Sequence, residues 1–184
     1  RLRTLAPSMP LVIEENMTAS LAEMLQDNDI DAAILALPFD LPGVTVTPLY
    51  DEPFLVVVPR GHSWAGRASM NPEEVTGEEV LLLKAGNCFR DQVLGACPQV
   101  SSAETDFRLG HSIGTLRSMV ASGLGVSILP ASAMASPYAS DLVSIVPFVE
   151  PEPTRRVVLV WRTGFMRPKA IEVLIEAVRG IDSP

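Results

Sequence analysis

The two cysteines, Cys88 and Cys97, carry the most versatile chemistry in this sequence, and they lie nine residues apart. Asn87 is a typical cap residue, and apolar residues recur at helical spacing over 88–96, so the pattern predicts a helix that begins at Cys88. At a helix N-terminus the unpaired backbone N–H groups and the helix dipole favour the thiolate over the thiol. Arg90 adds a positive charge near Cys88 if its side chain turns back. Cys88 is therefore predicted to be a reactive thiol.

A helix between the cysteines keeps their sulfur atoms apart. Nine helical residues rise about 13.5 Å and turn about 900°, which places the two sulfurs on opposite sides of the helix. A disulfide needs Cα atoms within about 7 Å of each other. Cys88 and Cys97 can therefore bond only if the helix unwinds. The alternative is that both are small buried apolar residues that never meet, although the polar residues 90–92 argue against it.

Length and composition describe a globular chain. Its 184 residues, 47% apolar and 20% charged, suffice for one domain or two small ones. The net charge of −8 argues against direct nucleic-acid binding by this part of the protein, because phosphate contacts need a basic surface. Redox-type cysteine spacing, without a signal peptide or a run of about eighteen apolar residues, predicts a soluble cytoplasmic protein with no membrane contact. His62 and His111 are isolated, so neither a metal nor a cofactor is expected.

Two segments resemble the LysR-type transcription regulators. Residues 115–133, TLRSMVASGLGVSILPASA, are similar to a signature shared across that family. Residues 87–92, NCFRDQ, followed by the second cysteine, resemble the redox segment of its peroxide-sensing members. In those members the first cysteine reacts with hydrogen peroxide, and the second resolves the sulfenic acid as an intramolecular disulfide. The resemblance therefore implies that Cys88 is the peroxide-reactive residue and Cys97 the resolving residue.

Three positions depart from the pattern of the peroxide-sensing members. Asn87 stands where they usually carry histidine, so an imidazole cannot hold or activate the thiol here. His111 and Gly114 replace what are usually a small polar residue and a glutamate.

The resemblance implies an α/β fold of two Rossmann-like lobes, similar to periplasmic binding proteins and typical of the LysR substrate-binding domain. Lobe I is expected to comprise 1–55 and 156–184, with its N-terminal part absent, and lobe II 56–155 with the redox cysteines. Two crossover strands near 51–60 and 154–162 are expected to join the lobes. A cleft between the lobes is where such folds place a ligand or a reactive group.

Apolar periodicity predicts the individual elements. Leu11–Glu14, Thr18–Asn28 and 31–38 are predicted as strand, helix and strand of a βαβ unit, with 31–38 apolar on both faces as parallel strands are. Further strands are predicted over 44–50, 53–60, 79–84, 107–109, 127–130, 142–148 and 157–161. A short helix is predicted to start at Pro72 with Asn71 as its cap, and further helices are predicted over 113–122 and 169–181.

Five more residues are candidates for the chemistry around Cys88. The resemblance matches Thr18 to a cleft-facing threonine that can hydrogen-bond to peroxide; the alternative is an ordinary N-cap. It also matches Arg155 to an arginine near the reactive cysteine, where a positive charge lowers the thiol pKa; the alternative is a solvated hinge charge. Asn87 and Arg90 flank the thiol. Asp91 opposes ionisation of a neighbouring thiol, so it is expected to pair with an arginine, cap backbone N–H groups or stabilise one state of the loop.

The first hypothesis is a redox switch in a DNA-binding transcription activator of the oxidative stress response. Its partners are hydrogen peroxide, further copies of itself in a dimer or tetramer, and a thiol reductant such as glutaredoxin. DNA and RNA polymerase are contacted only through the full-length protein. The second hypothesis is an effector domain that binds a small organic ligand in the cleft, with the cysteines incidental. A thiol peroxidase ranks last, because unwinding a helix in each cycle makes turnover slow, and we expect a sensor that is not an enzyme.

Overall fold

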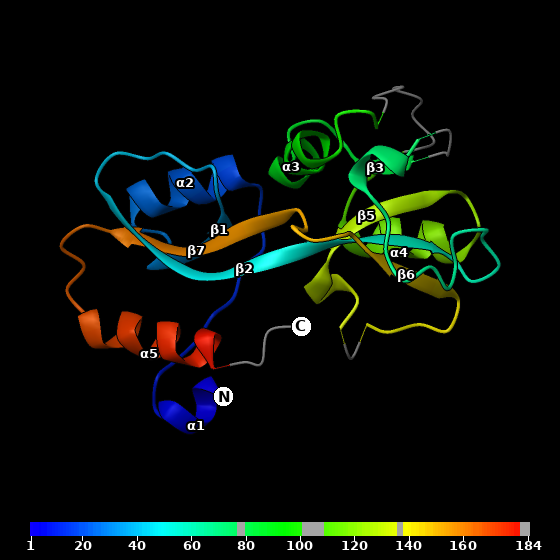
Figure 1. Cartoon of the computed structure of the whole chain (residues 1–184). Helices are drawn as coiled ribbons and strands as arrows, with labels where there is room; N and C mark the ends of the chain where they lie inside the picture. The colour runs from blue at the N-terminus through cyan, green and yellow to red at the C-terminus, as the bar shows by residue number, and fades with distance from the viewer. Residues whose placement is uncertain (77–79, 101–108, 136–137, 181–184) are drawn as a thin grey trace. The chain divides into compact units, whose positions relative to one another are not determined.

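The computed structural model describes residues 1–76, 80–100, 109–135 and 138–180, which form both helices and strands (Figure 1). The helices are α1 Leu2–Leu5, α2 Thr18–Asp27, α3 Cys88–Ala96, α4 Ile113–Ala121 and α5 Pro168–Arg179, with short 3-10 helices η1 Pro72–Glu74 and η3 Ala131–Ala133. The strands are β1 Ala32–Ala36, β2 Val44–Pro59, β3 Val80–Leu83, β4 Leu109–Gly110, β5 Val126–Pro130, β6 Val143–Pro147 and β7 Thr154–Arg162.

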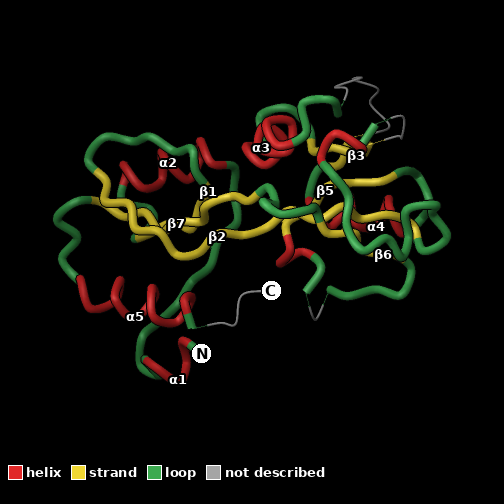
Figure 2. Tube along the Cα trace, in the orientation of Figure 1, coloured by secondary structure: helices red, strands yellow, loops and turns green. Residues whose placement is uncertain are grey.

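The chain forms two compact units. Of the described residues, those within 1–51 and 156–180 form the first unit, and those within 52–155 form the second. The boundaries fall inside β2 and near the start of β7, so each of these strands begins in one unit and ends in the other, as their traces in Figure 2 show. None of the described helices is long and apolar enough to cross a membrane.

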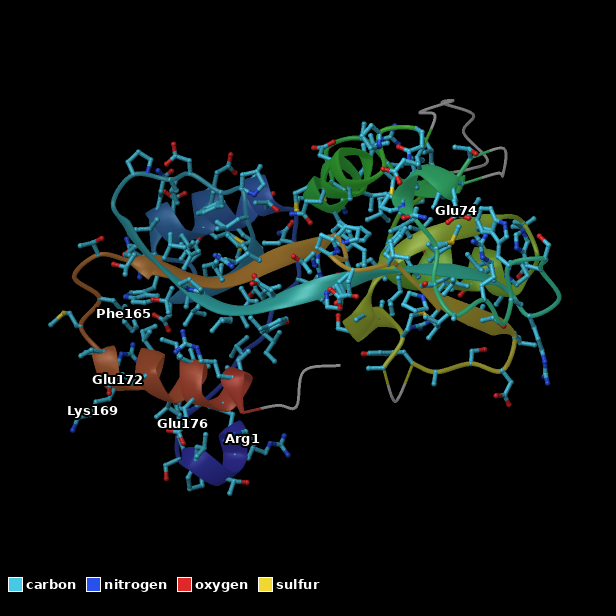
Figure 3. All side chains as sticks on the ribbon, viewed as in Figure 1. Arg1, Glu74, Phe165, Lys169, Glu172 and Glu176 are labelled. Carbon is cyan, nitrogen blue, oxygen red and sulfur yellow. The ribbon has the colours of Figure 1, made fainter. Side chains whose placement is uncertain are left out.

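In the first unit, α2 and α5 cover opposite faces of the sheet formed by β1, β7 and the start of β2 (Figure 1). Successive residues of a strand point to opposite faces, so β7 serves both helices. Val158 and Val160 pack with Leu25 of α2, whereas Val157 and Leu159 pack with the apolar stripe of α5. The outer face of α5 carries Lys169, Glu172 and Glu176, which are exposed (Figure 3).

The second unit has a mixed sheet. The later part of β2 pairs antiparallel with β5 and β6, and β3 pairs parallel with β5 and β4. The helices α3 and α4 pack on this sheet through Phe89, Val93, Leu116 and Val120, all of which belong to one buried cluster. Cys97 lies in the same cluster. The core of this unit therefore holds both ends of the predicted redox helix.

The predicted strand at Leu11–Glu14 is wrong. These residues have no regular secondary structure and form no ladder with any described strand, and Val12 and Ile13 are 85% and 81% exposed. A strand is stable only when its backbone N–H and C=O groups find a neighbour, so apolar alternation alone is insufficient. Consequently no βαβ unit forms here. The prediction for β1 is also wrong in two respects. The strand pairs antiparallel with β7 and not parallel to a described neighbour, and one of its faces is partly open, because Ile34 is 51% exposed.

The strands predicted at 44–50 and 53–60 form one continuous strand, β2. The two predicted strands left out Asp51 and Glu52, which are carboxylates in the middle of β2. Two arginines of β7 compensate them: Arg156 pairs with Asp51, and Arg155 pairs with Glu52. The other predicted strands and helices are found with ends shifted by a few residues, and residues 79, 107, 108 and 181 of those predictions lie outside the described ranges.

Candidate redox site

Cys88 is the first residue of α3, where the sequence predicts it. Gly86 turns the chain with φ +87°, a left-handed conformation that glycine adopts without strain. Asn87 is the N-cap, and its Oδ1 accepts a hydrogen bond from the Phe89 N–H at 3.0 Å. The Cys88 side chain is half-buried and is not in a disulfide. The thiol therefore lies at the positive end of a capped helix, in a position that favours an anion.

Cys97 ends the same helix and is fully buried. Its N–H donates to the Val93 carbonyl at 2.9 Å, which completes the last turn. Burial and, second, the charge of Glu73 raise the pKa of the Cys97 thiol to about 11. The two thiols are thus held at opposite ends of an intact helix, and the second one is protonated.

The Arg90 side chain does not extend into solvent. Its side chain is buried, and Nη1 donates to the Leu83 carbonyl at the end of β3 at 3.0 Å. Asp91 is exposed in the first turn of α3, where a negative charge stabilises the helix through its dipole. No arginine within the described ranges forms a salt bridge with Asp91, so the expected pairing with arginine is not seen there.

Arg155 lies against the residue that follows Cys88. Its guanidinium carbon is 5.1 Å from the centroid of the Phe89 ring. Its Nε and Nη2 atoms are both 2.7 Å from Oε2 of Glu52, and its side chain is only 17% exposed. The alternative of a solvated hinge charge is therefore wrong for Arg155. Glu52 is a residue of this site that the sequence analysis missed; its signal was a carboxylate inside an otherwise apolar strand.

Thr18 is the first residue of α2 and belongs to the first unit. The N-cap position is Met17, so the alternative reading of Thr18 as an ordinary N-cap is wrong. Its suggested hydrogen bond to peroxide stays a prediction. Within the described ranges no group of three or more His, Cys, Asp or Glu residues is arranged to hold a metal ion.

The chain is thus an α/β protein of two units that share two strands, with one cysteine at the start of α3 and the other at its C-cap. A protein-family model described as the LysR substrate binding domain matches residues 1–181, and the chain belongs to this family. The fold predicted from the sequence is confirmed by this match and by the solved structures it resembles.

The chain is similar to proteins named OxyR. It is 35% identical over 173 residues to the DNA-binding transcriptional dual regulator OxyR of Escherichia coli K12. The aligned region covers 94% of this chain and 57% of that protein. It resembles the reduced form of the OxyR regulatory domain from Pseudomonas aeruginosa, with 47% identity, a TM-score of 0.88, and coverage of 97% of this chain and 84% of that one. A reduced form of OxyR from Neisseria meningitidis matches with 47% identity, a TM-score of 0.90, and coverage of 97% and 85%. The chain thus spans little more than half the length of the E. coli relative.

Proposed function

We propose that this chain is the hydrogen-peroxide-sensing regulatory domain of a LysR-type transcription regulator. The observation that carries the proposal is α3 itself, which begins at a half-buried Cys88 and is followed at its C-cap by a fully buried Cys97. The names of the similar proteins support it, because they describe OxyR proteins and hydrogen-peroxide-inducible gene activators.

The chemistry proceeds in two steps. The Cys88 thiolate attacks one oxygen of hydrogen peroxide, the O–O bond breaks, and hydroxide leaves and takes up a proton to form water. Cys88 then carries a sulfenic acid. The Cys97 sulfur attacks the Cys88 sulfur, the S–O bond breaks, a disulfide forms and a second water leaves. Two electrons pass from the thiols to one peroxide, so one peroxide is consumed for each disulfide that forms.

The second step requires α3 to unwind, because an intact helix holds the sulfurs about 13.5 Å apart along its axis. Unwinding also takes Cys97 out of the apolar core that raises its thiol pKa. The resolving thiol is therefore activated by the same movement that brings it to Cys88. This coupling converts a local oxidation into a change of structure in the second unit.

Five residues have supporting roles in this proposal. Asn87 caps α3 in the reduced state, and Arg90 links the helix to β3 through a hydrogen bond to the Leu83 carbonyl. The negative charge of Asp91 in the first turn interacts favourably with the helix dipole. Thr18 hydrogen-bonds to the incoming peroxide. Arg155 favours the thiolate while it remains paired with Glu52.

The remaining parts of the proposal concern the whole protein. We propose a lobe I of residues 1–55 and 156–184 and a lobe II of residues 56–155, with the switch in lobe II; the division of the structure into two compact units supports this proposal. Repacking of lobe II alters how copies associate in a dimer or tetramer, and DNA and RNA polymerase are engaged through the full-length protein. A thiol reductant such as glutaredoxin reverses the disulfide in the cytoplasm.

The test is to locate the bond that peroxide makes. The reduced chain is treated with one equivalent of peroxide, digested under acid conditions and analysed by mass spectrometry. We expect a peptide pair joined through Cys88 and Cys97 and lighter by the mass of two hydrogen atoms. Cys97→Ser should stop at a sulfenic acid that a 1,3-dione traps, and Cys88→Ser should give no product. Failure to form this disulfide, or equal oxidation of Cys88→Ser, contradicts the proposal and favours an effector domain with incidental cysteines.

A further inference from the structure

Glu52 is a buried carboxylate whose two oxygens are both occupied. It lies in β2 with 1% of its surface exposed. Oε2 accepts from Arg155, and Oε1 accepts from the N–H of Ser132 at 2.9 Å. A buried charge is unfavourable unless it is paired and hydrogen-bonded. Because Glu52 is held from two sides, it fixes the Arg155 guanidinium in one orientation.

The fixed guanidinium contacts the ring of Phe89. The distance of 5.1 Å from the guanidinium carbon to the ring centroid is within the range of a cation–π contact. The Phe89 ring is also packed edge-to-face on Phe54, with centroids 5.6 Å apart and an interplanar angle of 84°. Phe89 is 3% exposed. The ring therefore lies in a socket, defined here as Phe54, Arg155 and, behind the arginine, Glu52.

Phe89 is the second residue of α3 and follows Cys88 directly. Its backbone N–H is held by the Asn87 side chain, and its ring is held by the socket. The first turn of α3 is thus anchored by a backbone contact and a side-chain contact at one residue. Unwinding this turn pulls the ring out of the socket, so the socket contacts stabilise the dithiol form and not the disulfide form.

We propose that Glu52 is a positioning residue of the redox switch, which sets the dithiol–disulfide equilibrium of Cys88 and Cys97 by holding Arg155 against Phe89. The inference rests on the proposed function, because it assumes that disulfide formation unwinds α3. In this role Glu52 changes the dithiol–disulfide equilibrium through Arg155 and Phe89 and takes no part in the reaction of the sulfur atoms.

The equilibrium is measured in glutathione buffers of stepped redox ratio, without peroxide. The two thiols of the chain lose two electrons and two protons to glutathione disulfide, which becomes two glutathione thiols. We expect Glu52→Gln, which keeps the size but removes the charge, to shift the equilibrium about tenfold toward the disulfide, or about 30 mV for this two-electron couple. Phe89→Leu stays apolar but loses both the π face that Arg155 contacts and the edge-to-face contact with Phe54, so it should shift the equilibrium at least as far in the same direction.

Two matched variants separate this role from general destabilisation. Phe148 is 3% exposed in the same buried cluster but is outside α3 and the socket, so Phe148→Leu should leave the equilibrium unchanged. Glu74, labelled in Figure 3, also pairs with an arginine, Arg67, and Glu74→Gln should likewise have no effect. A variant that lowers the free energy of unfolding of the dithiol and disulfide forms equally leaves the equilibrium between them unchanged. A shift therefore reports a contact that is present in only one of the two forms.

The double variant tests the connection itself. If Glu52 acts through Arg155 on Phe89, Glu52→Gln should shift the equilibrium much less in a Phe89→Leu background than alone. Shifts that multiply independently, or no shift for Glu52→Gln, overturn the inference even if peroxide oxidises the wild type normally. A disulfide that forms in glutathione buffer with the expected shifts but not with peroxide overturns the proposed sensor and leaves the inference intact.

A second measurement covers a variant that oxidises poorly. Amide hydrogen exchange of residues 88–96 in the reduced chain should be faster in Glu52→Gln and unchanged in Glu74→Gln. Equal protection of α3 in all three proteins contradicts the anchoring role directly.

Discussion

Alkylation of Cys97 measures how far the folded reduced chain suppresses its second thiol. The perturbation is pH, applied to Cys88→Ser so that Cys97 is the single cysteine left. Burial and the charge of Glu73 raise the pKa of the Cys97 thiol from 9.0 to about 11. At pH 8 about one thiol in a thousand is then ionised, compared with about one in ten at the ordinary pKa. The thiolate, which is the reactive form, is therefore about a hundredfold scarcer.

The assay is the rate of iodoacetamide labelling between pH 7 and pH 10.5, followed by mass spectrometry. At pH 8 we expect labelling of Cys97 at least about a hundredfold slower than in the same chain unfolded in urea, because burial restricts access in addition. The rate should rise about tenfold per pH unit up to pH 10, and Glu73→Gln should raise it a few-fold. Labelling at the unfolded rate, or a plateau near pH 9, would refute the reasoning.

The raised pKa of Cys97 also makes stability depend on alkaline pH. The folded chain holds the thiol proton more tightly than the unfolded chain, so the contribution is complete below about pH 9 and is lost as pH rises through about 11. The loss should be on the order of 2 kcal/mol. Urea unfolding at pH 8 and pH 10.5 should show this loss in the Cys88→Ser chain and not after the further change Cys97→Ala.

Three further substitutions have expected outcomes, each measured by urea unfolding of the reduced chain. Asn87→Ala removes the cap of α3 and should cost about 1 kcal/mol, whereas Asn87→Asp retains a cap and should cost less. Arg155→Ala leaves Glu52 buried and unpaired and should cost about 3–5 kcal/mol, whereas Arg156→Ala, which breaks a neighbouring exposed pair, should leave the unfolding midpoint unchanged. Gly95→Ala, at an exposed position of α3 with open space for a methyl group, should stabilise the reduced chain by about 0.5–1 kcal/mol. If the disulfide unwinds α3, that change should also make oxidation harder, by about 10–20 mV in glutathione buffer.

The redox helix was predictable because its signals are local. A cap at Asn87, apolar spacing over 88–96 and Pro98 after it specify both ends within a dozen residues. The same is true of the amphipathic helix α5. The strand predicted at Leu11–Glu14 is absent from the structure, because a strand depends on a neighbouring strand that local sequence does not reveal.

The supporting contacts of the site were beyond reach for a related reason. Glu52 and Arg155 are 103 residues apart in the chain, and Asp51 and Arg156 are 105 apart. No local pattern in the sequence joins β2 to β7, so the ion pairs between these two strands could not be predicted. The chemistry of Cys88 and the cap at Asn87 could be predicted from sequence, whereas Glu52 and its pairing with Arg155 became visible only through the fold.

The rate of peroxide oxidation tests the central claim most directly. The reduced chain is mixed with micromolar peroxide in a stopped-flow fluorimeter, with tryptophan fluorescence as the signal and free thiols counted afterwards. Sensing predicts a fast phase, first order in peroxide and orders of magnitude faster than oxidation of a free peptide thiol, which is lost in Cys88→Ser. Oxidation no faster than that of the free thiol would mean that the thiol pair is present but does not sense peroxide.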